Sequence, residues 1–220
     1  MANMSSAAGA EIERNEIKQH WDHHPYYASA EEWVHEFWGA DTRFLRLFKE
    51  LDLSSVLDLA CGHGRHSAQI LGKVGTITVS DINASNIEAC KKRFSGQKNV
   101  KYHVGSGSDF KGIGDTSLTA IFCYDAMVHF EIADVWSYVN DCARVLKKGG
   151  RALFHYSNYS ANPGGHYRDN PHSRTFCSEA AFRHFASRAG LDVVCSETFG
   201  WGAPGLYVPG MDALTLLQKP

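Results

Sequence analysis

Two carboxylates and a pair of glycines lie where two short apolar runs end. Residues 56–66 read VLDLACGHGRH, so Asp58 closes an apolar run and Gly62 and Gly64 follow in a turn. Glycine lets the backbone approach a ligand closely, and the helix that follows offers unpaired N–H groups and a positive dipole end. Asp81 ends the next apolar run, 75–80. This arrangement predicts a site for a polar cofactor, although an ordinary tight turn is the alternative for the glycines.

The charge of this segment separates it from a dinucleotide site. The third glycine of a G-x-G-x-x-G pattern is replaced by Ser67. A carboxylate at the position of Asp58 opposes a pyrophosphate but suits a cationic amino group or a sulfonium. Asp81, at the end of the second apolar run, is placed to accept from ribose hydroxyls. Together these residues predict a nucleoside site.

From this segment onward the chain resembles the class I S-adenosylmethionine-dependent methyltransferases that act on small molecules. Their first motif commonly reads Asp-Leu-Gly-Cys-Gly-x-Gly, and Ala60 stands here at the first glycine. The resemblance covers roughly residues 20–219 and continues in Asp109-Phe110 and in the segments 121–129 and 143–151. It implies S-adenosylmethionine as cofactor and S-adenosylhomocysteine as product.

The resemblance also implies which residues hold the cofactor. Asp58 would meet its ammonium group, the backbone of the turn its methionine and ribose portion, and Asp81 its ribose hydroxyls. Adenine would lie against residues 108–110, with a possible register shift to 106–107, and a plain Asx turn is the alternative for Asp109. The full set expected at the cofactor is Trp21, Tyr27, Asp58, Ala60, Gly62, Gly64, Asp81, Ile82, Ser108, Asp109, Phe110 and Tyr124.

Methyl transfer from a sulfonium is an in-line displacement, so the protein must position the acceptor, exclude water and, for a hydroxyl or a protonated nitrogen, remove a proton. His129 is the first candidate base, because it follows the fourth expected strand and imidazole titrates in the useful range. His155 on the fifth strand and Asp125 are further candidates. A structural role is the alternative for each of the three.

Two segments outside the expected sheet carry the candidate acceptor contacts. One is the aromatic group near the N-terminus, and the other is the glycine-rich loop 158–176 with its basic residues. Long loops in compact domains are frequently functional, whereas the aromatic group could instead pack the N-terminal helices. We expect the acceptor, a planar heterocycle, secondary metabolite or sugar methylated on oxygen or nitrogen, to contact Tyr26, Trp33, Trp38, His166, Arg168, His172 and Trp201.

Alternating apolar patterns indicate the elements that would position these residues. Helices are expected over 11–22, 30–37, 41–51, 64–72, 83–94, 131–147 and 178–189, and strands over 55–59, 75–80, 99–104, 118–124, 150–157, 191–199 and 211–218. The alternation predicts an α/β, doubly wound, mostly parallel sheet. The last two strands follow one another without a helix, so they should form an antiparallel edge hairpin in a seven-stranded sheet. Residues 1–52 would form a helical lid on a methyltransferase domain, 53–220.

Composition narrows the class of protein. The 220 residues are 44% apolar and 21% charged with a formal net charge of −2, which is typical of one globular α/β domain and disfavours nucleic acid or an anionic membrane as a partner. No apolar stretch predicts a membrane span or signal peptide, so a cytoplasmic monomer or homodimer is expected. The six cysteines lack C-x-x-C pairs and the histidines lack ligand spacing, so reduced thiols and no metal are expected.

Two other functions remain open. A noncatalytic module that binds adenosylmethionine and regulates a partner would keep the cofactor site but lack a productive acceptor site. A nicotinamide-dependent oxidoreductase is disfavoured by Asp58 and by the antiparallel hairpin.

Overall fold

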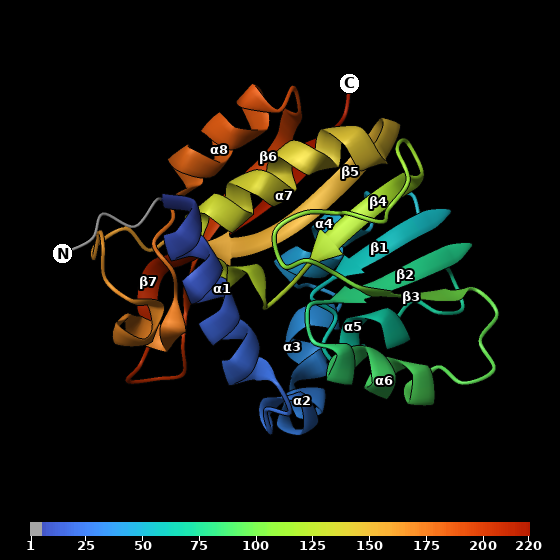
Figure 1. Cartoon of the computed structure of the whole chain (residues 1–220), viewed down its shortest axis with the longest axis horizontal. Coiled ribbons are helices and arrows are strands. Elements are labelled where there is room, and N and C mark those ends of the chain that lie inside the picture. Colours follow the sequence, from blue (N-terminus) through green and yellow to red (C-terminus); the bar gives the residue numbers. More distant parts are fainter. Residues whose placement is uncertain (1–5) are drawn as a thin grey trace.

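The computed structural model describes residues 6–220, which form a seven-stranded sheet flanked by helices (Figure 1). The strand order is β3-β2-β1-β4-β5-β7-β6. Strands β1 to β5 pair in parallel, and β7 runs antiparallel to both β5 and β6. The predicted α/β fold with an antiparallel edge hairpin is confirmed. The strands are β1 (Ser55–Leu59), β2 (Thr76–Asp81), β3 (Val100–Val104), β4 (Leu118–Cys123), β5 (Leu146–Ser157), β6 (Asp192–Trp201) and β7 (Val208–Gln218).

Helices cover both faces of the sheet because successive strand residues point to opposite sides. Leu57 of β1 belongs to the core on the side of α7 and α8, while its neighbour Val56 belongs to the core on the side of α4 and α6. The helices are α1 (Ser6–Trp21), α2 (Tyr26–Ser29), α3 (Val34–Trp38), α4 (Arg43–Phe48), α5 (Arg65–Ala68), α6 (Ala84–Arg93), α7 (Ile132–Val145) and α8 (Glu179–Arg188), with 3₁₀ turns η1 (Ala30–Trp33), η2 (Met127–His129), η3 (Tyr167–Asp169) and η4 (Pro171–Ser173).

Several boundaries differ from the sequence prediction. Strand β5 begins at Leu146, which pairs with Leu118 of β4, so the helix expected over 131–147 ends earlier, at Val145. The helix expected over 64–72 is the short α5, and the segment 30–37 is divided between η1 and α3. The hairpin strands extend toward their connection, where Trp201 pairs with Val208. Strand pairing decides the changes in β5 and in the hairpin, so local propensity could not indicate those two.

Helix α1 is held across the carboxyl ends of the parallel strands. The Arg14 guanidinium forms an ion pair with Asp134 of α7. On the other side, the Asn83 side-chain amide, between β2 and α6, donates to the Lys18 carbonyl oxygen at 3.1 Å. These contacts place the following residues, 21–27, above the turn that ends β1. The structure shows no helix, within the residues it describes, that is long and apolar enough to cross a membrane.

Candidate active site

The turn after β1 has an unusual backbone. Ala60, Gly62 and Gly64 have φ angles of 56°, 53° and 77°, in the left-handed region that favours glycine. Ala60 therefore adopts, at a cost of about 1–2 kcal/mol, the conformation that glycine would adopt freely. The turn lies at the switch point of the sheet, where β2 and β4 flank β1, which is where open α/β sheets bind ligands.

Asp81, at the end of β2, fixes this turn. Its carboxylate accepts from the backbone N–H groups of Gly62, at 2.9 Å, and Asn83, at 2.8 Å, and from the Asn86 amide at 3.1 Å. Asp81 is buried, and burial raises its pKa although the three donors act in the opposite direction. The side chain therefore joins β1, β2 and α6 at one point.

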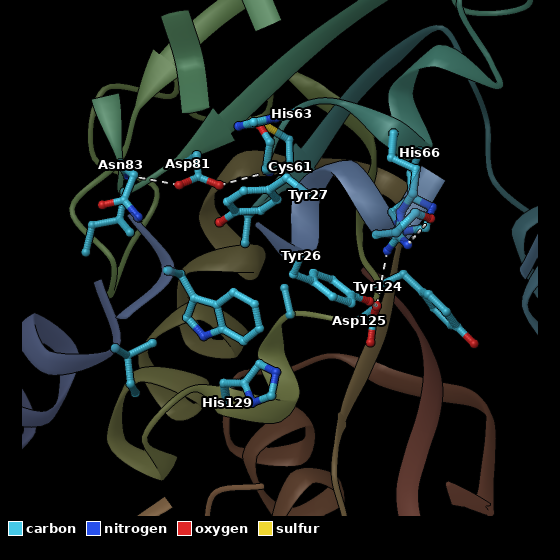
Figure 2. Close-up of a pocket in the computed structure, with 18 of the residues that line it drawn as sticks. Tyr26, Tyr27, Cys61, His63, His66, Asp81, Asn83, Tyr124, Asp125 and His129 are labelled. Carbon is cyan, nitrogen blue, oxygen red and sulfur yellow. Dashed lines mark hydrogen bonds and ion pairs between the residues drawn. The ribbon is translucent and has the colours of Figure 1, made fainter. Parts of the chain in front are cut away.

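A cavity of about 100 Å³ lies between this turn and the N-terminal residues (Figure 2). Tyr27 lies beside Asp81 in this view, and its hydroxyl accepts from the Asn86 amide at 2.9 Å. Trp21 lines this cavity, and its buried Nε1 has no hydrogen-bond partner among residues 6–220. Such atoms in a native structure call for an explanation, and a polar ligand supplies one.

A second, wider cleft of about 980 Å³ opens on the other side of Tyr26. Aromatic side chains from the N-terminal helices and the β6–β7 hairpin line it, among them Trp33, Phe37 and Trp201, and the rings of Phe37 and Trp201 stack at 6.2 Å. The two cavities share one wall, which consists of Trp21, Tyr26, Tyr124, Asp125 and His129.

Asp125 anchors the shared wall. It has a φ of 59°, and its carboxylate accepts from the Tyr26 hydroxyl and from Arg65 Nη2, the latter at 3.1 Å. Burial would raise the pKa of Asp125, but Arg65 and the Tyr26 hydroxyl outweigh it and lower the pKa. The Asp125 N–H donates to His155 Nδ1 at 3.1 Å. Asp125 is thus an ionised carboxylate with fixed donors, which makes it a weak base.

His129 lies at the opposite edge of the shared wall, in η2 (Figure 2). Its Nδ1 lies 2.8 Å from the Ser173 carbonyl oxygen, which can only accept, so a neutral ring carries its proton on Nδ1. Burial and the Arg174 guanidinium lower the pKa of His129 to about 4. The ring is therefore neutral near pH 7, with a free lone pair on Nε2.

Comparison with known proteins indicates the protein family. Residues 56–150 match the family model described as a methyltransferase domain. The chain carries a class I, S-adenosylmethionine-dependent methyltransferase domain. Its cofactor is S-adenosylmethionine. A search of curated proteins found no match.

Solved structures share the fold of this methyltransferase at low identity. Geranyl diphosphate C-methyltransferase from Streptomyces coelicolor A3(2), in complex with Mg²⁺, geranyl diphosphate and S-adenosylhomocysteine, superposes with a TM-score of 0.70 at 13% identity, covering 94% of this chain and 98% of that one. A methyltransferase in complex with the Haloferax volcanii Trm112 activator gives 0.66 at 16%, covering 93% and 98%. A methyltransferase from Methanosarcina mazei gives 0.61 at 15%, covering 79% and 96%. Such likenesses show the fold alone.

Most residues expected at the cofactor lie at the first cavity of the methyltransferase. Trp21, Tyr27, Ala60, Gly62, Asp81, Ile82 and Tyr124 line it. Asp58 lies beneath the turn instead, where it accepts from the Ser67 hydroxyl at 2.6 Å. Gly64 is covered by Phe94 and Cys90. Ser108 and Asp109 lie outside this cavity and Phe110 is in the core, whereas Gly105 and Gly107 line a small adjoining cavity with Ile82. That position favours the register shift toward 106–107.

The expected catalytic and acceptor residues divide in a similar way. His129 and Asp125 lie in the shared wall, but His155 is fully buried between β5 and β7, with Nε2 2.9 Å from Asp212. Tyr26, Trp33, His172 and Trp201 line the wide cleft. Trp38 instead donates to His66 Nδ1 at 3.0 Å, His166 pairs with Glu16, and Arg168 contacts Tyr167. These last three lie outside both cavities.

Sequence reasoning missed several side chains of the site. Arg65 and His66, directly after the glycine turn, line the first cavity, and Arg43 lines the cleft. Arg174, one of the basic residues of the loop 158–176 expected near the acceptor, also lines the cleft. The motif position could have indicated Arg65 and His66, because they begin the helix after the turn. Nothing in the local pattern indicates Arg43. No group of three or more His, Cys, Asp or Glu side chains able to hold a metal ion occurs within residues 6–220.

Proposed function

We propose that this methyltransferase transfers a methyl group to an oxygen or nitrogen atom of a small molecule bound in the wide cleft. One observation carries the proposal: the cavity beside the glycine turn and the cleft share a wall made by His129, Asp125 and Tyr26. A methyl group bound on one side and an acceptor on the other would meet at this wall. The reaction needs such close approach because it is an in-line displacement.

The cofactor would occupy the first cavity and its extension toward Ile82 and Gly107. Asp81 suits the ribose hydroxyls and the 60–64 turn suits the methionine portion. The unpartnered Trp21 Nε1, in the lining of the cavity, provides a donor for a polar group of the cofactor. The bound cofactor supplies a methyl group activated by a positive sulfur. Because the cavity measures about 100 Å³, residues 21–27 of the proposed N-terminal lid, 1–52, would have to shift to admit it.

His129 would act as the base when the acceptor loses a proton. Its Nδ1–H is committed to the Ser173 carbonyl, so Nε2 remains free to accept the proton. Asp125 is less suited because Arg65 and the Tyr26 hydroxyl stabilise its ionised carboxylate and so weaken its affinity for a proton. The other candidate, His155, would act as a positioning residue, because it is buried and bonded to both Asp125 and Asp212.

The cleft favours an acceptor with a flat apolar body. Trp33 is half exposed on one side, and Trp201 and Phe199 lie on the other. Aromatic side chains bind planar rings and the apolar faces of sugars. The volume of about 980 Å³ is that of a drug-sized ligand site. The net charge of −2 gives no support to a nucleic-acid substrate. The geranyl diphosphate enzyme offers a small-molecule precedent on this fold.

A product assay tests the proposal. The protein is incubated with methyl-labelled S-adenosylmethionine and a panel of phenols, amines, planar heterocycles and sugars, and labelled products are identified by mass spectrometry. Transfer to an O or N atom of a panel member supports the proposal. If S-adenosylhomocysteine binds at micromolar strength in calorimetry, labelled product only at carbon would contradict the O or N acceptor class. Under the same binding, no labelled product across the panel would favour the regulatory-module alternative.

A further inference from the structure

The segment that faces His129 from the β5–α8 connection has a strained backbone. His172 and Ser173 have φ angles of 51° and 54°, in the left-handed region, although neither is a glycine. Such residues persist only where their surroundings hold them, and they cluster at functional sites. Their neighbour Thr175 clamps the segment onto η2: its N–H donates to the Val128 carbonyl at 3.1 Å and its hydroxyl to Phe130 O at 2.7 Å.

A buried ion pair holds the same segment from below. Arg174 Nε and Nη2 donate to the two carboxylate oxygens of Asp212 in β7, at 2.9 and 2.6 Å, and both side chains are almost fully buried. The remaining arm, Nη1, donates to the His172 carbonyl at 3.1 Å. His155 Nε2 lies 2.9 Å from the same carboxylate. The guanidinium fork therefore fixes the path of residues 172–174 relative to the sheet.

The Ser173 carbonyl, which this fork positions, receives the Nδ1–H of His129 at 2.8 Å. A hydrogen bond on one ring nitrogen sets the tautomer and orientation of the whole imidazole. We propose that Arg174 and Asp212 are positioning residues that keep His129 in its Nδ1-protonated tautomer, with an unprotonated Nε2 in the wall between the two cavities. For its catalytic meaning this inference rests on the proposed role of His129 as base.

The tautomer can be measured without any acceptor. Long-range ¹H–¹⁵N correlation spectra of the histidine-labelled protein distinguish the two neutral tautomers, and the signals of His129 among the 12 histidines are identified from their loss in His129→Asn. The main test is the double variant Arg174→Met/Asp212→Asn, which removes both charges together and so avoids leaving one buried without its partner. We expect wild-type His129 as a single Nδ1–H tautomer and a mixture of tautomers in the double variant.

A matched control exists at the opposite end of the same strand pair. Arg151 of β5 donates to Gln218 of β7 at 2.8 Å and to Glu50, outside both cavities. Arg151→Met should leave the His129 spectrum as in the wild type. If the double variant fails to fold by circular dichroism, Arg174→Lys decides, because a single ammonium cannot contact Asp212 and the His172 carbonyl with the same fork geometry.

Two results would overturn the inference. One is a wild-type His129 that carries its proton on Nε2. The other is a folded double variant, or folded Arg174→Lys, with the wild-type tautomer. Because the readout needs no methyl transfer, a panel with no labelled product would count against the proposed function and leave this result standing. Conversely, if the variants keep the wild-type tautomer while the wild-type protein gives a labelled product in the panel assay, only the positioning role of Arg174 and Asp212 is refuted.

Discussion

Tyr27 lies against Gly62, in the turn where we propose that the methionine portion of the cofactor binds. A Cβ atom on Gly62 would stand 2.7 Å from Tyr27 Cε1, closer than real contacts allow. The same ring stacks on His63, with centroids 4.5 Å apart. One aromatic side chain from the N-terminal segment thus covers the backbone turn of β1.

This contact predicts the effect of Gly62→Ala. The new methyl group would clash with Tyr27, and a φ of 53° is strained for alanine. We therefore expect a loss of about 1–2 kcal/mol of stability from the backbone alone, and weaker S-adenosylhomocysteine binding. Urea unfolding and calorimetry measure the two effects. Gly72→Ala is the control, because a Cβ there has no neighbour within 4 Å among the described residues. If Gly62→Ala and Gly72→Ala had the same stability and the same affinity for S-adenosylhomocysteine, the prediction would be refuted.

Asp81→Ala should weaken cofactor binding strongly. It removes a carboxylate proposed for the ribose and leaves the Gly62 and Asn83 N–H groups without their acceptor. A hydrogen bond to a charged group contributes about 1.5–3 kcal/mol, so affinity for S-adenosylhomocysteine should fall roughly ten- to hundredfold. Asp192→Ala, which removes an exposed carboxylate at the start of β6 that lines neither cavity, should leave the affinity unchanged. Calorimetric titration of both variants would reject the ribose role if Asp81→Ala bound as tightly as the wild type.

His129→Asn should lower kcat by about 10²–10⁴ once an acceptor is known. Asparagine can still donate to the Ser173 carbonyl, so the turn should be preserved while the base is lost. Because burial and Arg174 lower the pKa of His129 to about 4, the wild-type rate should decline only as pH falls toward 4, and the variant should lack this decline. His166→Asn, outside both cavities, serves as control. If the wild type and His129→Asn had the same rate at every pH, His129 would be excluded as the base.

Trp33→Ala should raise the KM for the acceptor and leave cofactor affinity unchanged. The Trp33 side chain lines the cleft and is 52% exposed, so its removal costs little core packing. Val194→Ala truncates a similarly exposed apolar side chain, 47% exposed, that lies on β6 outside the cleft. Steady-state kinetics and melting curves compare the two. A KM for Trp33→Ala equal to that of Val194→Ala would place the acceptor elsewhere.

His66 should make the fold sensitive to acid. Burial and the neighbouring Arg65 guanidinium lower its pKa from 6.5 to about 3, because a protonated ring would face Arg65 and the Trp38 N–H. The unfolded chain then binds the proton more readily, so stability is full above about pH 6.5 and falls as pH decreases toward 3. The slope is at most about 1.4 kcal/mol per pH unit.

Urea unfolding between pH 4.5 and 7.5 checks this dependence. His66→Gln should flatten the slope, although the part due to His129 would remain. His184→Gln, on the exposed face of α8, should keep the wild-type slope. A His66→Gln slope identical to that of the wild type would show that another group controls the acid response.

The amino-acid sequence by itself determined the sheet, its antiparallel hairpin, the glycine turn with Asp81 and the methyl donor. Each depends on residues close in the chain: alternating apolar runs, a turn that requires left-handed backbone, and a carboxylate at the end of the next strand. Even the departure at Ala60 kept the backbone conformation of a glycine.

Only the tertiary structure decided which polar and aromatic side chains meet. His155 looked like a site residue but is buried against Asp212, 57 positions away. Arg174 was expected only as a basic residue of the acceptor loop, yet it pairs with the same carboxylate and lowers the pKa of His129. Strand order and the paths of the loops bring these groups together, and no periodicity encodes them. The physical reason is that an apolar pattern depends on residues close in the sequence. The partner of a polar side chain depends instead on which distant segment the fold brings next to it.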